Sequence, residues 1–311
     1  MSVELRGCYP ILATPFCPDG EVDEESVVSL VRHLRTVGLP GFTMFGLASE
    51  FYKLSDADRE ILIEAAFDAR TSDQTVIVSV TAHSLEVARK QALRAEEAGA
   101  DALMLLPPFF LGPSEADIGR HVLEVAAATS LPIMVQYAPA QTGVKMNADS
   151  FVQLNREAPN VRYVKVEGAP PGPSISGISA GGKIKCLVGY GGLQLIDGLR
   201  RGAVGVQPAS GVADYYPHIL KAFDEGDLEG AYALHADLLP LVNLLMQAIE
   251  PLNRLEKIVL HRRGIIAHDY CRAASYEPDE LMLAELDRFV VRISGRLHPS
   301  APWPVEPSGT G

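Results

Sequence analysis

The residue best suited to chemistry is a lysine in one short apolar segment. Residues 161–166 read VRYVKV, with the β-branched and aromatic side chains typical of a strand, and Lys165 near its end is followed by Glu167. A buried ammonium is costly, so such a lysine either pairs with an anion or becomes a neutral amine. A neutral amine is a nucleophile that condenses with a ketone to form a Schiff base. The alternatives are an edge strand that keeps Lys165 in water, or a lysine that only pairs with Glu167.

The elements that would position this lysine alternate along the chain. We expect strands at residues 8–14, 41–46, 76–81, 102–106, 133–137, 161–166, 184–189 and 203–207, and helices at 24–37, 56–70, 85–98, 115–128 and 148–157. Ser55 is expected to cap the helix that follows it, and Gly99 to end the helix before the fourth strand. Eight rounds of strand and helix predict an α/β fold, a (β/α)8 TIM barrel. One round is irregular, because the prolines within 169–173 leave room for only a short or irregular helix.

The strand pattern stops before the last third of the chain. Residues 216–223, 228–248, 252–263 and 280–296 have helical patterns. We therefore expect a catalytic barrel at 1–223, a C-terminal helical region at 224–297, and a disordered tail at 298–311, where Pro, Ser and Gly are frequent.

Composition narrows the class of protein. The net charge of −12 and the pI near 5.1 argue against nucleic-acid or anionic-membrane partners, which require basic patches. The sequence has no apolar run of about 18 residues and no apolar leader, so neither membrane spanning nor export is expected. The four cysteines lack metal or disulfide spacing, and no H-x-H or H-E-x-x-H motif occurs. We expect a cytoplasmic, acidic enzyme without a metal site.

Chemistry in such a barrel gathers at the carboxyl ends of the strands. Small residues and polar tips dominate the expected rim, which suits a small oxygenated substrate. The candidates for contact with it are Thr14, Ala48, Ser49, Gln136, Tyr137, Gly189 and Gln207, and His83 is expected to be a polar rim residue.

The order of the motifs carries a family resemblance over roughly residues 6–296. The sequence has A-T-P-F after the first strand, G-x-x-x-E after the second, P-P-F-F followed by Pro113 after the fourth, and V-K at the sixth. This order resembles the pyruvate-dependent class I aldolase family of dihydrodipicolinate synthase and N-acetylneuraminate lyase. I-M-V-Q-x-A-P, S-E and K-x-E are most similar to its 2-keto-3-deoxy sugar-acid dehydratase branch.

The resemblance implies roles for the residues that match. Lys165 matches the Schiff-base lysine. The second loop of the family binds the substrate carboxylate through G-T-T-G-E or G-S-T-G-E, which is G-L-A-S-E at residues 46–50 here. Both usual hydroxyl positions are apolar, so backbone N–H groups near Ala48 and the hydroxyl of Ser49 remain for that task.

The fifth strand departs from the family pattern. Aligned on the proline of Y-N-V-P, the position of the catalytic tyrosine holds Gln136, and Tyr137 comes one residue late. Side chains alternate along a strand, so a regular register turns Gln136 toward Lys165 and Tyr137 away from it. Phe109 and Phe110 replace the tyrosine pair of the synthases, and Gln141 replaces a basic residue. These differences count against dihydrodipicolinate synthase itself.

These observations predict a class I lyase that acts on a small 2-oxo acid through a lysine imine and needs no cofactor. The branch resemblance favours dehydration of a 2-keto-3-deoxy sugar acid. One alternative is a pyruvate-dependent aldolase or condensing enzyme like dihydrodipicolinate synthase or N-acetylneuraminate lyase. Another is a non-catalytic barrel that binds 2-oxo acids or has a regulatory role, since its second loop is altered. The family also implies a homo-oligomer, a tetramer or a dimer.

Overall fold

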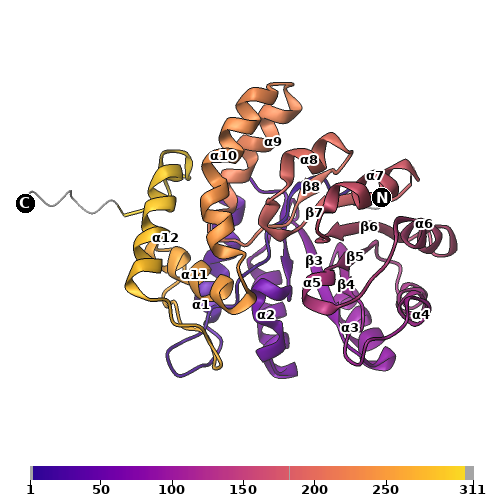
Figure 1. The fold of residues 1–311 in the computed structure, drawn as a ribbon. Coiled ribbons are helices and arrows are strands. Elements are labelled where there is room, and N and C mark those ends of the chain that lie inside the picture. Colours follow the sequence, from indigo (N-terminus) through magenta and orange to yellow (C-terminus); the bar gives the residue numbers. More distant parts are fainter. Residues whose placement is uncertain (1–2, 182, 305–311) are drawn as a thin grey trace, which may run out of the picture. The chain divides into compact units, whose positions relative to one another are not determined.

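Eight parallel strands form a nearly closed barrel with flanking helices (Figure 1). The computed structural model describes residues 3–181 and 183–304. The strands are β1 (Gly7–Cys8), β2 (Gly41–Met44), β3 (Thr75–Thr81), β4 (Ala102–Leu106), β5 (Ile133–Tyr137), β6 (Val161–Val166), β7 (Lys185–Val188) and β8 (Gly205–Val206). Their order is β1-β8-β7-β6-β5-β4-β3-β2. Between β1 and β2, the hydroxyl of Thr43 donates to the carbonyl of Tyr9 at 3.5 Å. The predicted TIM barrel is therefore confirmed.

The contacts divide the chain into two compact units. The first unit comprises the residues up to Tyr9, Gly41–Phe45 and Thr75–Pro208, and it contains the strands. Its helices are α3 (Leu85–Glu97), α4 (Glu115–Ala126), α5 (Pro139–Thr142), α6 (Ala148–Glu157), α7 (Pro171–Ala180) and α8 (Leu195–Arg200), with the 3-10 turn η3 (Tyr190–Gly192). In this unit α3, α4 and α6 lie outside β3–β6 (Figure 1).

The second unit comprises Pro10–Pro40, Gly46–Gln74 and the residues from Ala209 onward. Its helices are α1 (Glu24–Thr36), α2 (Asp56–Ala69), α9 (Tyr216–Asp224), α10 (Leu228–Leu245), α11 (Ile249–Arg262) and α12 (Glu280–Ile293), with 3-10 turns η1 (Leu47–Ser49), η2 (Phe51–Lys53), η4 (Ala213–Tyr215) and η5 (Ser294–Arg296). The C-terminal helices that we expected are present, with α10 packed against α9 and α12. The domain boundary expected after residue 223 stays a prediction.

One face of the sheet is the barrel interior. Tyr163 and Lys165 are two residues apart on β6, so their side chains share a face. The hydroxyl of Tyr163 accepts a hydrogen bond from the N–H of Leu5, before β1, at 2.9 Å. Because β7 and β8 separate β6 from β1 in the sheet, this bond crosses the inside of the barrel. Lys165 therefore faces the interior.

Most helices and the central strands lie where they were expected, but four strands are shorter: β2 and β7 each by two residues, and β1 and β8 by more. The expected strands at 8–14 and 203–207 are reduced to Gly7–Cys8 and Gly205–Val206. Proline has no N–H to give to a ladder, and Pro10 and Pro208 stand just beyond these two strands. Beyond them, only a single bridge between Ile11 and Ala209 continues the pairing.

Two helix ends follow the predicted signals and one helix does not. Ser55 and Asp58 form a reciprocal capping box at the start of α2, and Gly99, with a φ of 90°, follows the end of α3. However, α7 is a helix of 10 residues, so the expected short or irregular segment was wrong. Its prolines lie at the start of the helix, where no intrahelical partner is lost.

The segment expected to be a disordered tail is only partly described. Residues 305–311 lie outside the described residues. Among residues 298–304, Ala301 and Trp303 are buried, and the carbonyl of Ala301 accepts a hydrogen bond from Nε of Arg263 at 2.8 Å. This first part of the expected tail is therefore packed. Trp303, the one tryptophan of the chain, is among its buried residues. In the described part of the chain, no helix is both long enough and apolar enough to span a membrane.

Candidate active site

The site is built around Lys165, which is 3% exposed although it carries an amine. Its Nζ lies 3.2 Å from Oε1 of Glu167, which is 7% exposed. The two residues are two positions apart at the end of β6, so the backbone turns both side chains the same way. The structure thus places a nearly dry amine and a carboxylate within proton-transfer distance. The alternative of a lysine held in water is excluded by this burial.

Gln136 joins this pair, as its alternation along β5 predicted. It stands opposite Lys165 in the register of β5 and β6. Its Nε2 donates to Oε2 of Glu167 at 2.7 Å. One irregularity in this strand pair lies between Ile133 and Met134, before Gln136, so the register at the site is regular. Gln136 therefore orients the carboxylate that faces the lysine amine.

Gly189, at the end of β7, gives Glu167 its space. A Cβ placed on Gly189 would lie 2.1 Å from Cγ of Glu167, which is far inside van der Waals contact. The next residue, Tyr190, adopts a φ of 51° and directs its N–H toward Oε1 of Glu167 at 3.4 Å. The hydroxyl of Tyr190 accepts a hydrogen bond from Nε2 of Gln141 at 2.8 Å. Gly189 acts here by close approach to Glu167.

Tyr137 is not brought to the lysine. It belongs to the opposite face of β5 from Gln136, and its ring packs edge-on against Phe151 of α6 with centroids 5.4 Å apart. Gly168 allows this packing, since a Cβ there would lie 3.2 Å from the ring. The alternation of side chains predicted this orientation, and the role of Tyr137 as a catalytic acid or base stays a prediction.

Gln207 continues the polar interior. Its Nε2 donates to the hydroxyl of Thr43 on β2 at 2.7 Å, and the residue is 2% exposed. Gly205, two residues earlier, stands opposite Leu187, which in turn stands opposite Lys165. Gln207 therefore shares the interior face with Lys165.

The remaining predicted contacts, Thr14, Ala48 and Ser49, lie in the second unit. The hydroxyl of Thr14 donates to the carbonyl of Ser49 at 2.7 Å, and the hydroxyl of Ser49 donates to the carbonyl of Leu12 at 2.6 Å. The N–H of Ser49 donates to the carbonyl of Gly46 at 2.9 Å. Ser49 thus links its own loop to the loop that contains Leu12 and Thr14. Both of its donors, the N–H and the hydroxyl, are engaged in hydrogen bonds within the protein.

Behind these loops, helix α11 supplies a buried carboxyl. Oε1 of Glu256 accepts hydrogen bonds from the N–H and the hydroxyl of Ser210, at 2.5 and 2.7 Å. Burial raises the pKa of Glu256 from its ordinary value to about 7. Beside it, Lys257 forms an ion pair with Glu50, the residue after Ser49. No sequence motif indicated Glu256 or Lys257, because they lie on an amphipathic helix far along the chain.

His83 is exposed at the rim, as expected, with its ring 4.7 Å from that of Phe109. In the described part of the chain, no three His, Cys, Asp or Glu residues are grouped to hold a metal ion.

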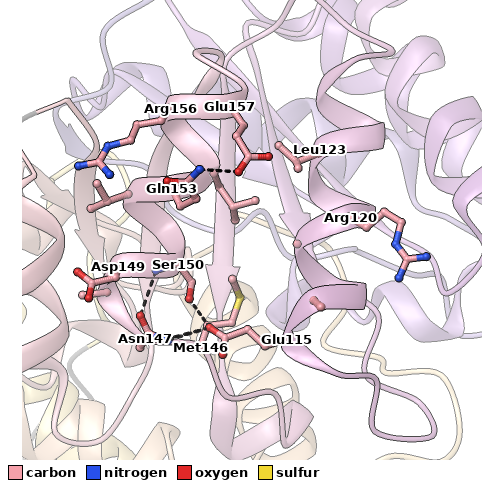
Figure 2. A pocket seen from close by; sticks show the side chains of 15 residues that line it. Glu115, Arg120, Leu123, Met146, Asn147, Asp149, Ser150, Gln153, Arg156 and Glu157 are labelled. Carbon is pink, nitrogen blue, oxygen red and sulfur yellow. Dashed lines mark hydrogen bonds between the residues drawn. The ribbon is translucent and has the colours of Figure 1, made fainter.

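The first unit contains a cavity and a groove. A cavity of about 590 Å³ adjoins Gly189 and Tyr190 and extends along α7 and α8. A wider groove of about 1060 Å³ runs between α4 and α6 (Figure 2). There Glu115 accepts hydrogen bonds from Asn147 and Ser150, and Gln153 donates to Glu157. The groove contains none of the predicted site residues.

Comparison with known proteins agrees with this architecture. The dihydrodipicolinate synthetase family matches residues 4–291. The L-2-keto-3-deoxyarabonate dehydratase of Azospirillum brasilense is 31% identical over 76% of this chain and 79% of its own. The 4-hydroxy-tetrahydrodipicolinate synthase of Kineococcus radiotolerans is 34% identical over 76% of each chain. The crystal structure of dihydrodipicolinate synthase from Rhodopseudomonas palustris superposes with a TM-score of 0.88 at 26% identity, covering 94% of this chain and 99% of that one. Fold, motif order and these matches agree, and the chain belongs to the dihydrodipicolinate synthetase family.

Proposed function

We propose that the protein, a lyase of this family, dehydrates a small 2-keto-3-deoxy sugar acid through an imine on Lys165. The observation that carries the proposal is the buried contact of 3.2 Å between the Lys165 amine and the Glu167 carboxylate. An amine held this way can give its proton to the carboxylate and attack a ketone as the neutral nucleophile. Glu167 then passes this proton, and after it a second amine proton, to the former ketone oxygen, which leaves as water, so the iminium ion forms and Glu167 is again a carboxylate. Gln136 keeps the carboxylate in place during the transfer.

The later steps follow from the iminium ion. It withdraws electrons and acidifies the protons on C3 of the substrate. Glu167, as the base beside the nitrogen, removes one of them and leaves an enamine. The enamine expels the hydroxyl on C4, which takes up a proton and departs as water, and hydrolysis of the new imine returns Lys165. In this proposal Glu167 returns every proton that it accepts, to the ketone oxygen during imine formation and to the leaving C4 hydroxyl during dehydration.

The support for dehydration comes from residues as well as relatives. The interior face holds Gln136 in place of a tyrosine, and Tyr137 packs on the helix side. The Azospirillum relative is named as a dehydratase of a 2-keto-3-deoxy acid. For the substrate carboxylate we propose the backbone N–H of Ala48 as the donor, because the hydroxyls of Thr14 and Ser49 and the N–H of Ser49 are already engaged. Thr14 and Ser49 would then act by fixing the loop that carries Ala48.

Condensation of pyruvate with an aldehyde is the second candidate. Several relatives are named 4-hydroxy-tetrahydrodipicolinate synthase, including the one from Kineococcus. A tyrosine at the position of Gln136 would favour this chemistry, and the structure has Tyr137 on the other face.

Borohydride trapping tests the shared imine step. The protein is incubated with pyruvate or with a 2-keto-3-deoxy pentonate, reduced, and digested for mass spectrometry. We expect the added mass on Lys165 and its loss in Lys165→Ala. No adduct with any 2-oxo acid would overturn the lyase mechanism in favour of a binding or regulatory barrel. An assay for free pyruvate then separates the reactions, because its release from the keto-deoxy acid indicates aldol cleavage instead of dehydration.

The trapping assay also tests the need for a metal, and a separate measurement tests assembly. We propose that no metal or organic cofactor is needed, so dialysis against a chelator should leave the rate of trapping unchanged. The homo-oligomer implied by the family is checked by light scattering on the eluted protein.

A further inference from the structure

Three polar atoms on the interior of the first unit lack partners. The Oγ of Ser79, the Oγ1 of Thr81 and the Oε1 of Gln207 are buried and find no hydrogen-bond partner among the residues that the structure describes. Leaving a buried polar atom unpaired costs about 1 to 3 kcal/mol. Native proteins rarely contain buried polar atoms without a partner. One reason to retain such an atom is a ligand that supplies the missing hydrogen bond.

The register shows that Ser79 and Thr81 face the inside of the barrel. Ser79 on β3 stands opposite Met104, and Met104 stands opposite Met134, which stands opposite Tyr163. Tyr163 points into the interior, so Ser79 does as well. Thr81 is two residues further along β3, nearer the carboxyl ends, and has the same direction.

Gln207 is fixed in one orientation. Its Nε2 is bound to the hydroxyl of Thr43 at 2.7 Å, so its Oε1 is a prearranged acceptor. Thr43 on β2, Lys165 on β6 and Gln207 on β8 come from alternate strands, the pattern from which layers inside such a barrel are built. An amide oxygen can only accept, so the missing partner of Gln207 is a donor such as a substrate hydroxyl.

We propose that Ser79, Thr81 and Gln207 determine specificity by binding the hydroxyl groups of the substrate chain. The proposal rests on the proposed function, in which Lys165 binds the ketone of the same molecule. Two hydroxyls that can donate or accept, together with one fixed acceptor, suit a 2-oxo acid with hydroxyl groups beyond C3. Pyruvate offers none of these groups. The substrate class is therefore a polyhydroxylated 2-oxo acid.

The test compares two keto acids on the full chain. The half-saturating concentration for borohydride trapping at Lys165 is measured with pyruvate and with a 2-keto-3-deoxy pentonate. The variants are Thr81→Val, which keeps the shape of the side chain, Ser79→Ala, and Gln207→Met. We expect each to raise the half-saturating concentration for the hydroxylated acid about fivefold more than that for pyruvate, the loss of one hydrogen bond.

Thr75→Val is the matched control. Thr75 lies on the same strand and face as Thr81, at the opposite end of β3, so its substitution should leave the ratio of the two half-saturating concentrations unchanged. A purely structural role would raise both concentrations together in the three variants.

The outcomes separate this inference from the proposed function. If the unaltered protein traps pyruvate on Lys165 but none of the three variants changes the ratio, the hydroxyl-binding role is wrong and the lyase mechanism stands. If it traps neither keto acid, the mechanism fails and the inference fails with it. Three independent variants keep the test decisive should one of them not fold.

Discussion

Gly189 and Glu167 approach so closely that a Cβ on Gly189 would lie 2.1 Å from the Cγ of Glu167. The two residues come from neighbouring strands, β7 and β6, and the contact holds the carboxylate beside the amine of Lys165. Glycine is required at position 189 because a side chain would clash with Glu167. Its backbone conformation does not require glycine, since a φ of −95° is allowed for other residues.

Gly189→Ala should therefore displace Glu167 and slow imine formation. Displacement of a reacting group by about 1 Å costs on the order of 10²-fold in rate. The measurement is the rate of borohydride trapping with a saturating 2-oxo acid. Gly295→Ala serves as the control, because a Cβ on Gly295 meets nothing within 4 Å. Equal rates in the two variants would show that the position of Glu167 does not matter.

Glu167→Gln tests the carboxylate itself. The substitution keeps the shape and the contact with Gln136 but removes the group that accepts the proton of Lys165. General acid–base catalysis contributes on the order of 10² to 10⁴ in rate. We expect a fall of that size in the rate of imine formation, with an unchanged circular dichroism spectrum. A fall of less than threefold would assign Glu167 to ion pairing alone.

Tyr137→Phe should have little effect on the same rate. The hydroxyl is lost, but the ring keeps its packing against Phe151. We expect trapping within twofold of the unaltered protein. A loss of tenfold or more would mean that the hydroxyl reaches the reacting atoms, and would restore Tyr137 as the acid or base.

Much of the barrel could be predicted because its central strands carry unbroken apolar runs. The bounds of β4, β5 and β6 agree with the predicted ones. The opposite directions of Gln136 and Tyr137 followed from alternation alone. The apolar runs did not predict that β1 and β8 are short, because the runs extend past Pro10 and up to Pro208, whereas the ladder stops near residues that have no N–H to donate.

The contacts between elements could not be predicted in the same way. The bond between Gln136 and Glu167 and the close approach of Gly189 depend on the distance between neighbouring strands, which local pattern does not encode. Glu256 lies 46 residues beyond Ser210, on a helix whose apolar face looks ordinary. Its role follows from packing that only the folded chain provides.

The buried carboxyl of Glu256 should make stability depend on pH. Burial raises its pKa from 4.5 to about 7. Between these values the native state binds more protons than the unfolded chain, so the free energy of unfolding falls as the pH rises from about 4.5 to about 7. The loss from this group is at most about 3 kcal/mol. Glu256→Gln should remove this part of the pH dependence.

The measurement for Glu256 is urea unfolding at pH 5 and at pH 8. The difference in unfolding free energy between the two pH values should shrink in Glu256→Gln and persist in Glu229→Gln, whose side chain is exposed on α10. The same difference in both variants would mean that Glu256 is ionised throughout this range.

The buried ion pair of Arg263 and Asp214 should be costly to break. Their side chains are 0% and 2% exposed and share two hydrogen bonds, of 2.9 and 2.6 Å. Asp214→Asn leaves the guanidinium buried without its counter-charge, which costs about 3 to 5 kcal/mol of unfolding free energy. The control is Asp237→Asn, which breaks the exposed pair with Arg292 and should cost less than about 1 kcal/mol. Denaturant titration of both variants measures the loss of unfolding free energy. Equal losses would mean that burial does not make the pair of Arg263 and Asp214 more costly to break than the exposed pair.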